Sequence, residues 1–119
     1  MSELTELNLI QLKQSVRVAA RPAADQIASF PNGVDVEEEI AIDFDAHCRW
    51  ALEGHQAPDL TADQRSSLVA LDTRLDLMSG KQNADLWTDE ALRTRPEWEE
   101  VRRDARKILE AFGWSLEEQ

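Results

Sequence analysis

The sequence predicts an all-α protein, a compact helical bundle of four to six helices, and three observations support this. Apolar residues recur at intervals of three and four along most of the 119 residues, which is the spacing of one face of an α-helix. Glycine and proline number four each and fall between these periodic segments. No segment alternates polar and apolar residues for long enough to predict a strand. We expect residues 1–119 to form a single helical domain, because this length is typical of one domain.

Two helices are predicted in the first quarter of the chain. The first extends from about Asn8 to Arg21, and Pro22 ends or kinks it. The same proline can begin a short second helix that continues through Phe30, where Pro, Asn and Gly in succession predict a turn. The apolar stripe of the first helix consists of Leu9, Leu12, Val16 and Ala19 or Ala20.

Capping residues predict where the later helices begin. Asp35 with Glu38 indicates a capping box before residues 36–53, which we call the acidic helix. Thr61 with Gln64 indicates a second capping box for the next helix, and a short helical turn is expected near Thr88. The last helix begins at Pro96 and has its apolar face at Trp98, Val101, Ala105, Ile108, Leu109 and Phe112. The glycines expected to end these helices are Gly54, Gly80 and Gly113.

Most of the net charge lies in the acidic helix and the turn after it. Residues 35–60 contain eight acidic side chains and one basic one, which gives −7 of the total of −11. Residues 84–119 contain ten acidic and six basic side chains, which gives −4. Because nucleic acids and anionic membranes are polyanions, we expect neither as a partner. A basic protein surface is the partner that this charge favours.

The composition also indicates a compartment. A single cysteine cannot form an internal disulfide, and this fits a reducing environment. No apolar run approaches the roughly 20 residues of a membrane helix. Glu3 and Glu6 stand where a signal peptide would carry basic residues. We therefore expect a cytoplasmic protein.

The acidic helix has two apolar stripes when its residues are placed at 100° intervals. The first, which we expect in the core, contains Val36, Ile40, Phe44, His47 and Ala51, with Ala41, Cys48 and Leu52 at its edge. The second contains Ile42, Ala46 and Trp50. In one interpretation neighbouring helices cover both stripes, and Trp50 is a partly buried packing residue.

In the other interpretation the second stripe is an exposed anchor inside a rim of carboxylates. An aromatic anchor inside a charged rim is the usual anatomy of a protein-binding patch. The carboxylate of Glu37 would add to the attraction of a basic partner. The predicted partner-binding residues are Glu38, Glu39, Ile42, Asp43, Asp45, Ala46, Trp50 and Glu53.

One constellation could carry chemistry. Glu39, Asp43 and His47 share a helix face, and His55 follows shortly after, so these four are candidate ligands of a divalent metal or an acid–base pair. Helical di-metal sites use carboxylates from several helices, commonly in Glu-x-x-His motifs, and the sequence has no such motif. The alternative is an Asp43–His47 hydrogen bond at the edge of the core. We expect no metal and no cofactor, and we expect Cys48 to be a buried structural thiol.

The last helix carries basic residues interleaved with acidic ones, which predicts a solvated surface of ion pairs. The tryptophans near this helix are expected to cap one end of the core. The basic residues of this segment are Arg93, Arg95, Arg102, Arg103, Arg106 and Lys107, and the tryptophans are Trp87, Trp98 and Trp114.

In size, charge and helicity the chain resembles small acidic helical immunity and antitoxin proteins of bacteria, which block the positive active sites of toxin nucleases. The resemblance implies a non-enzymatic inhibitor of a basic protein, and no residue role is carried over from it. A second hypothesis is an oligomerising helical domain, a homodimer that uses the stripe at residues 42, 46 and 50. A third is a metal-dependent helical enzyme at the four candidate ligands.

Overall fold

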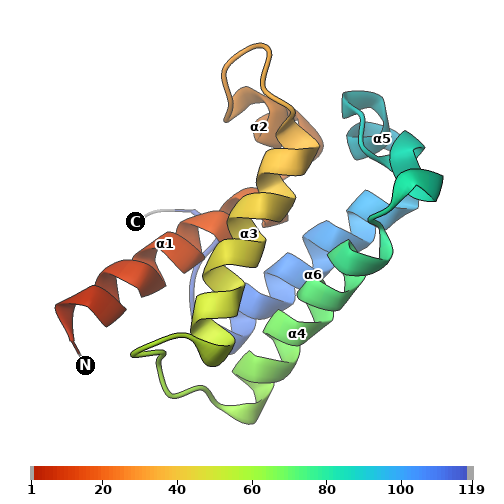
Figure 1. The fold of residues 1–119 in the computed structure, drawn as a ribbon. Helices are drawn as coiled ribbons and strands as arrows, with labels where there is room; N and C mark the ends of the chain where they lie inside the picture. Colours follow the sequence, from red (N-terminus) through yellow and green to blue (C-terminus); the bar gives the residue numbers. More distant parts are fainter. Residues whose placement is uncertain (1, 118–119) are drawn as a thin grey trace.

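The computed structural model describes residues 2–117 and confirms an all-α bundle. Within these residues there are six α-helices, one short 3₁₀ helix and no strand. The elements are α1 (Glu3–Ala20), α2 (Ala23–Ala28), α3 (Val36–Glu53), α4 (Ala62–Leu77), η1 (Lys81–Leu86), α5 (Asp89–Thr94) and α6 (Pro96–Phe112). The four long helices α1, α3, α4 and α6 make up the body, and the short elements α2, η1 and α5 lie toward one end of it (Figure 1).

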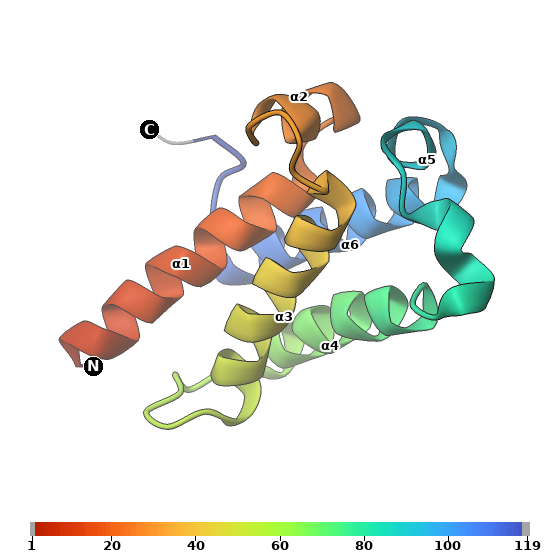
Figure 2. The same cartoon turned by 45° about the horizontal axis from the view of Figure 1, so that its top comes forward.

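Helix α6 holds the bundle together because it packs along both α1 and α4. Helix α3, the acidic helix, packs extensively on α1 and much less on α4. From the loop that joins them, α3 and α4 diverge toward the end of the molecule where η1 and α5 lie (Figures 1 and 2). One flank of α3 is therefore covered, and the flank that faces α4 is partly open.

Helix α1 begins five residues earlier than the sequence pattern predicts. The hydroxyl of Ser2 accepts a hydrogen bond from the backbone N–H of Thr5, which caps the helix. Glu3 and Glu6 in the first turn complement the positive end of the helix dipole. The prediction of a start near Asn8 followed the apolar stripe alone, but local capping can extend a helix beyond the part that is buried.

The predicted caps of α3 and α4 form to different extents. Thr61 and Gln64 make both bonds of the capping box, with distances of 3.1 and 2.9 Å. Asp35 accepts a hydrogen bond from the N–H of Glu38 at 3.2 Å, so the N-cap of α3 is confirmed. Within the described residues the Glu38 side chain makes no return bond. Its carboxylate is consequently available at the surface.

Two of the glycines end helices for different physical reasons. Gly113 has φ 70° in the left-handed region, and the N–H of Trp114 donates to the carbonyl oxygen of Leu109 at 2.9 Å, as in the Schellman ending. Gly54 has φ −78°, which any residue can adopt. There a Cβ atom would lie 2.7 Å from the side chain of Trp50, so glycine is needed for close packing.

The buried face of α3 differs from the predicted face at one edge. Val36, Ile40, Phe44 and Ala51 are buried as expected, but His47 is only partly buried. The buried sector is instead centred closer to Cys48, because α1 and α4 enclose that side of the helix. The prediction that His47 belongs to the core is therefore wrong.

One member of the predicted basic surface is buried. Arg102 donates hydrogen bonds to the Gln26 side chain at 3.2 Å and to the Leu92 carbonyl oxygen at 3.1 Å. It therefore joins α6 to α2 and α5, and it is not part of a solvated face. At the surface of α6, Arg103 pairs with Glu100 at 2.6 Å, as expected, and the guanidinium of Arg102 also reaches Glu99 at 3.4 Å.

Candidate functional site: the groove between α3 and α4

A groove follows the partly open flank of α3. It consists of three adjoining hollows of about 410, 340 and 160 Å³ between α3 and the segment from α4 to Trp87. The first two share Ala41, Ile42 and Ser79, and the last two share Asp45, Arg49 and Asp72. We call this feature the α3–α4 groove. Its carboxylates are Asp35, Glu38, Asp45, Glu53, Asp72 and Asp76.

These carboxylates greatly outnumber the cations around them. Arg49 is the one basic residue that lines the three hollows, and it contacts Asp45 at 3.1 and 3.3 Å. Within the described residues the carboxylates of Glu38, Asp72 and Asp76 take part in no hydrogen bond or ion pair. Six carboxylates and one guanidinium leave a formal charge of −5 along the groove.

The crowding of negative charge affects Asp72. Its pKa is raised, first by partial burial against the groove wall and then by the neighbouring charge of Asp45. The nearby Arg49 opposes this shift but does not reverse it. A raised pKa means that the folded protein holds this carboxylate in its charged form at some cost, which a cation in the groove would relieve.

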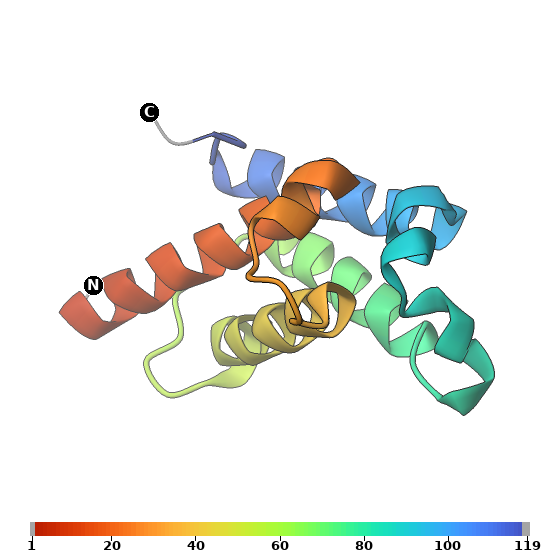
Figure 3. The same ribbon diagram turned by 90° about the horizontal axis from the view of Figure 1, so that it is seen from above.

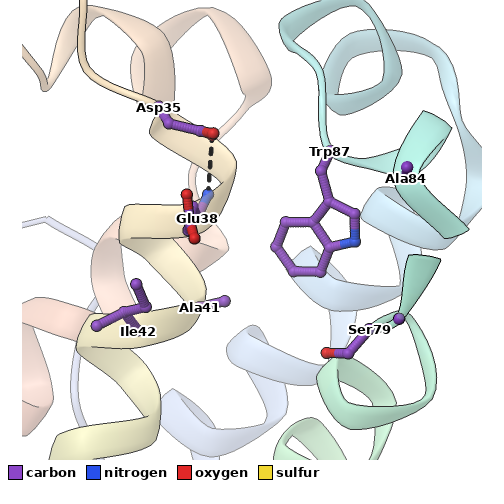
Figure 4. A pocket seen from close by; sticks show the side chains of 8 residues that line it. Asp35, Glu38, Ala41, Ile42, Ser79, Ala84 and Trp87 are labelled. Atoms are coloured by element: carbon purple, nitrogen blue, oxygen red, sulfur yellow. Dashed lines mark hydrogen bonds between the residues drawn. The ribbon is translucent and has the colours of Figure 1, made fainter.

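The wide end of the groove contains a fixed aromatic ring. Trp87 donates its indole N–H to the carbonyl oxygen of Met78 at 2.9 Å and packs edge-to-face against Trp98 at 5.3 Å between ring centroids. Figure 4 shows the Trp87 ring across the pocket from Asp35, the N-cap of α3, and from Glu38 and Ala41 of α3, while the side chain of Ile42 is turned away from the ring. The side chain of Ile42 is 56% exposed. This end therefore combines a rigid indole, an exposed aliphatic side chain and two carboxylates.

The structure divides the predicted partner-binding residues into two groups. Glu38, Ile42, Asp45 and Glu53 line the groove. The second group lines none of the three hollows. In this group Glu39, Asp43 and Ala46 are exposed, and Trp50 is half-buried.

Trp50 was predicted as the anchor of the patch, and the structure gives it a packing role. The indole lies against the core and donates its N–H to the carbonyl oxygen of His55 at 3.2 Å. This contact ties the end of α3 to the loop that follows. The interpretation of Trp50 as a partly buried packing residue fits this position. The accompanying expectation that neighbouring helices cover the whole second stripe does not, because Ile42 and Ala46 remain exposed.

Glu37 is a correction to the expected negative surface. Its side chain is 2% exposed, so it cannot attract a partner through solvent. Burial raises the pKa of Glu37 to about 7, and hydrogen bonding with the Asp89 carboxyl adds to the increase. Two carboxyl groups from the first turns of α3 and α5 therefore meet at this junction, which favours the protonated form of Glu37.

The candidate metal ligands do not form a site in the described part of the chain. The Nδ1 atom of His47 donates to the backbone carbonyl of Asp43 at 2.8 Å and lies 3.6 Å from its carboxylate. Among residues 2–117 no group of three His, Cys, Asp or Glu side chains could hold a metal ion. Glu39 and His55 are exposed and join no such group.

The thiol of Cys48 is buried beside the groove. Burial raises its pKa to about 12, and the charges of Asp72 and Asp45 add to the shift. A thiol with so high a pKa is almost entirely protonated at neutral pH and is a poor nucleophile. This environment matches the expected structural role.

Sequence reasoning missed the opposite wall of the groove. Asp72 and Asp76 are four residues apart on α4, so they share a face, and this spacing was an available signal. Trp87 was assigned to the end of the core, and its edge-to-face contact with Trp98 agrees with that. No pattern in the sequence indicates that the same ring also lines a pocket with α3.

Comparison with known proteins gives no functional assignment, since the chain matches no protein-family model, no curated protein and no solved structure. None of the described helices is long and apolar enough to cross a membrane. Any functional conclusion therefore depends on the groove itself.

Proposed function

We propose that this protein is a non-enzymatic binding module that recognises a basic surface of another protein through the α3–α4 groove. The observation that carries the proposal is a set of carboxylates without internal partners, on both walls of a groove with apolar lining. Charge and apolar surface in one concave site favour a ligand that is cationic and amphipathic at the same time.

The two properties have different roles in binding. A formal charge of −5 along the groove attracts a cationic partner over a distance of about one Debye length, roughly 8 Å at physiological salt. The exposed side chain of Ile42 and the ring of Trp87 supply the apolar contact that holds the partner after encounter. Salt should therefore slow association more than it speeds dissociation.

At a finer level we propose inhibition by masking, as in the immunity and antitoxin proteins that the chain resembles. A surface that must hold polyanionic nucleic acid is rich in lysine and arginine. The groove offers carboxylates to such side chains and would cover them. In this role the protein needs no catalytic group of its own.

Self-association is a second candidate, and a different surface favours it. Leu4, Leu7 and Ile10 recur every three residues along α1 and are 55%, 57% and 49% exposed. The N-terminal half of α1 extends away from the other helices (Figure 3). Pairing through the stripe of residues 42, 46 and 50 is disfavoured, because it would bring two negative surfaces together. Light scattering of the protein and of Leu7→Asp tests this candidate, and a monomer at all concentrations rejects it.

The binding proposal is tested with a synthetic amphipathic helix that has leucines on one face and arginines on the other. Its affinity is measured by fluorescence anisotropy for the protein and for Asp72→Asn/Asp76→Asn, in low and physiological salt. We expect the double variant to bind about thirtyfold more weakly, since each of the two lost charge pairs contributes on the order of 1 kcal/mol. We also expect a version of the peptide with glutamates in place of the arginines not to bind.

A matched control separates the groove from the overall charge. Glu3→Gln/Glu110→Gln also removes two exposed carboxylates, but neither residue lines the groove. If both double variants lose the same affinity, the interaction is a general charge effect and the groove is not the binding site.

A further inference from the structure

We propose that the pocket at the wide end of the α3–α4 groove binds the side chain of one arginine from a basic amphipathic helix of the partner. This inference rests on the proposed function and names the ligand group that the groove recognises. The pocket of about 410 Å³ lies between Glu38 and Ile42 of α3 and Trp87 (Figure 4). Its volume falls within the range of roughly 300–1,000 Å³ found for ligand sites in general.

The indole of Trp87 is a ready-made surface for a planar cation. The hydrogen bond to Met78 and the edge-to-face contact with Trp98 fix the ring in place before any ligand arrives. Its N–H is already used, and Figure 4 shows the edge of its six-membered ring directed toward α3, so a cation would stack on the ring face beside that edge. A guanidinium above an indole gains on the order of 0.5–2 kcal/mol from the cation–π interaction.

Two carboxylates on the opposite wall complete the recognition of a cation. The carboxylate of Glu38 has no partner within the described residues, and one oxygen of Asp35 accepts a hydrogen bond from the backbone N–H of Glu38. The N-terminus of α3 contributes about half a positive charge, which opposes a cation there. Two full negative charges exceed it, so the net effect at the pocket is attraction.

The mixture of lining groups favours arginine over lysine. An arginine has an aliphatic stem that can lie along Ile42 and Ala41, and a planar head that can stack on an aromatic face. The same head can donate to two carboxylates at once, whereas an ammonium acts as a point charge. Glu38 and Trp87 on opposite walls of the pocket suit the planar group.

The shape of the groove indicates that the arginine belongs to a helix. The groove follows α3 from Asp35 to Glu53, and α3 spans about 27 Å at 1.5 Å per residue. A helix lying along it would place cationic residues three or four apart, and these could meet Asp45 and Asp72 further along. The arginine pocket would then set the register of the partner.

The test uses a fluorescein-labelled amphipathic peptide of about the length of α3, with arginines on its polar face. Binding is measured for the protein, for Glu38→Gln and for the matched control Glu39→Gln, which removes the neighbouring exposed carboxylate outside the groove. We expect Glu38→Gln to weaken binding about tenfold and Glu39→Gln less than about twofold. Replacing the one arginine that enters the pocket by neutral citrulline should weaken binding to the unmodified protein by the same factor. The same replacement should have no effect on binding to Glu38→Gln.

A second measurement reports on the ring directly. In ¹⁵N NMR spectra the indole signal of Trp87 should shift on addition of the peptide, while those of Trp50 and Trp114 should not. Replacing the key arginine by lysine should weaken binding at least about threefold, and equal affinity would overturn the preference for arginine.

The outcomes separate the two proposals. If Asp72→Asn/Asp76→Asn weakens binding but Glu38→Gln and Glu39→Gln act alike, the binding function stands and the arginine pocket is wrong. If the peptide binds none of the proteins, both proposals are wrong. Circular dichroism of each variant checks that the fold is retained, which we expect because Glu38 and Glu39 are exposed residues of α3.

Discussion

The carboxylates of α6 and those of the α3–α4 groove differ in what surrounds them. On α6, Glu99, Glu100 and Asp104 each have an arginine nitrogen within 3.4 Å. In the groove only Asp45 has such a partner, Arg49, at 3.1 Å. Most of the negative charge on α6 is thus paired within the fold, whereas most of the groove carboxylates remain available to a partner.

The difference shows how to separate structural charge from charge that is available for recognition. A carboxylate that is paired within the chain contributes to packing between helices, as Asp104 does by joining α6 to Arg74 of α4. A carboxylate on a groove wall without a partner raises the electrostatic energy of the folded state, as the raised pKa of Asp72 indicates. Net charge counted along the sequence does not distinguish the two.

Glu37 is a third kind of carboxyl group, buried beside another carboxyl. Its replacement gives the largest predicted effect on stability. Its pKa is about 7 in the folded protein and 4.5 without burial, so the stabilising proton is fully bound below about pH 4.5 and is lost as the pH rises through 7. The shift corresponds to about 3 kcal/mol, which solvent screening reduces to about 2. Glu37→Gln keeps a neutral donor toward Asp89, so its stability advantage over the unmodified protein should grow from near zero at about pH 4.5 to about 2 kcal/mol above pH 7.

Urea unfolding of both proteins at several pH values between about 4 and 8 measures this effect. The titratable groups that both proteins share contribute equally to the two free energies of unfolding, so their contributions cancel in the difference. A stability difference that does not change with pH would show that folding does not raise the pKa of Glu37, and the junction between α3 and α5 would then need another explanation.

The second prediction breaks the paired region. Arg74→Ala leaves the 6%-exposed carboxylate of Asp104 without its cation. We expect a loss of about 1–2 kcal/mol at pH 7, less than for a fully buried pair because Arg74 is partly exposed. Thermal unfolding measures the loss, and Arg74→Ala/Asp104→Asn should recover part of it. No loss would mean that α6 is not stabilised by its ion pairs.

The third prediction concerns the groove and has the opposite sign. Asp72→Asn removes a carboxylate whose pKa is raised by burial and by Asp45. Stability should increase by about 0.3 kcal/mol at pH 7, a small value because the charges are partly exposed, and the increase should vanish below pH 3 where the carboxylate is protonated. A decrease in stability at pH 7 would show that Asp72 has a structural partner and would weaken the contrast between the two regions.

The smallest predicted effect concerns the one cation of the groove. Arg49 competes with an incoming cation for Asp45 because the two side chains are in contact. Arg49→Gln should leave the melting temperature unchanged within error, since both groups are exposed. The same variant should bind the arginine-rich peptide about two- to threefold more tightly, and weaker binding would mean that Arg49 itself contacts the ligand.

The sequence by itself determined the helical fold class, the capping of α4 by Thr61 and Gln64, and the ending of α6 at Gly113, because these depend on residues within one turn of each other. It also placed the acid on α3. It did not determine which residues of α3 line the groove. Four of the eight predicted binding residues do so, and Trp50, the predicted anchor, does not.

The tertiary structure alone decided that Asp72, Asp76 and Trp87 form the other wall, and that Glu37 is hidden against α5. The physical reason is that a helix pattern gives the direction of each side chain only relative to its own axis. Which side faces a neighbour, and where two helices diverge, depends on the packing of α1 and α4 around α6, which brings together residues far apart in the chain.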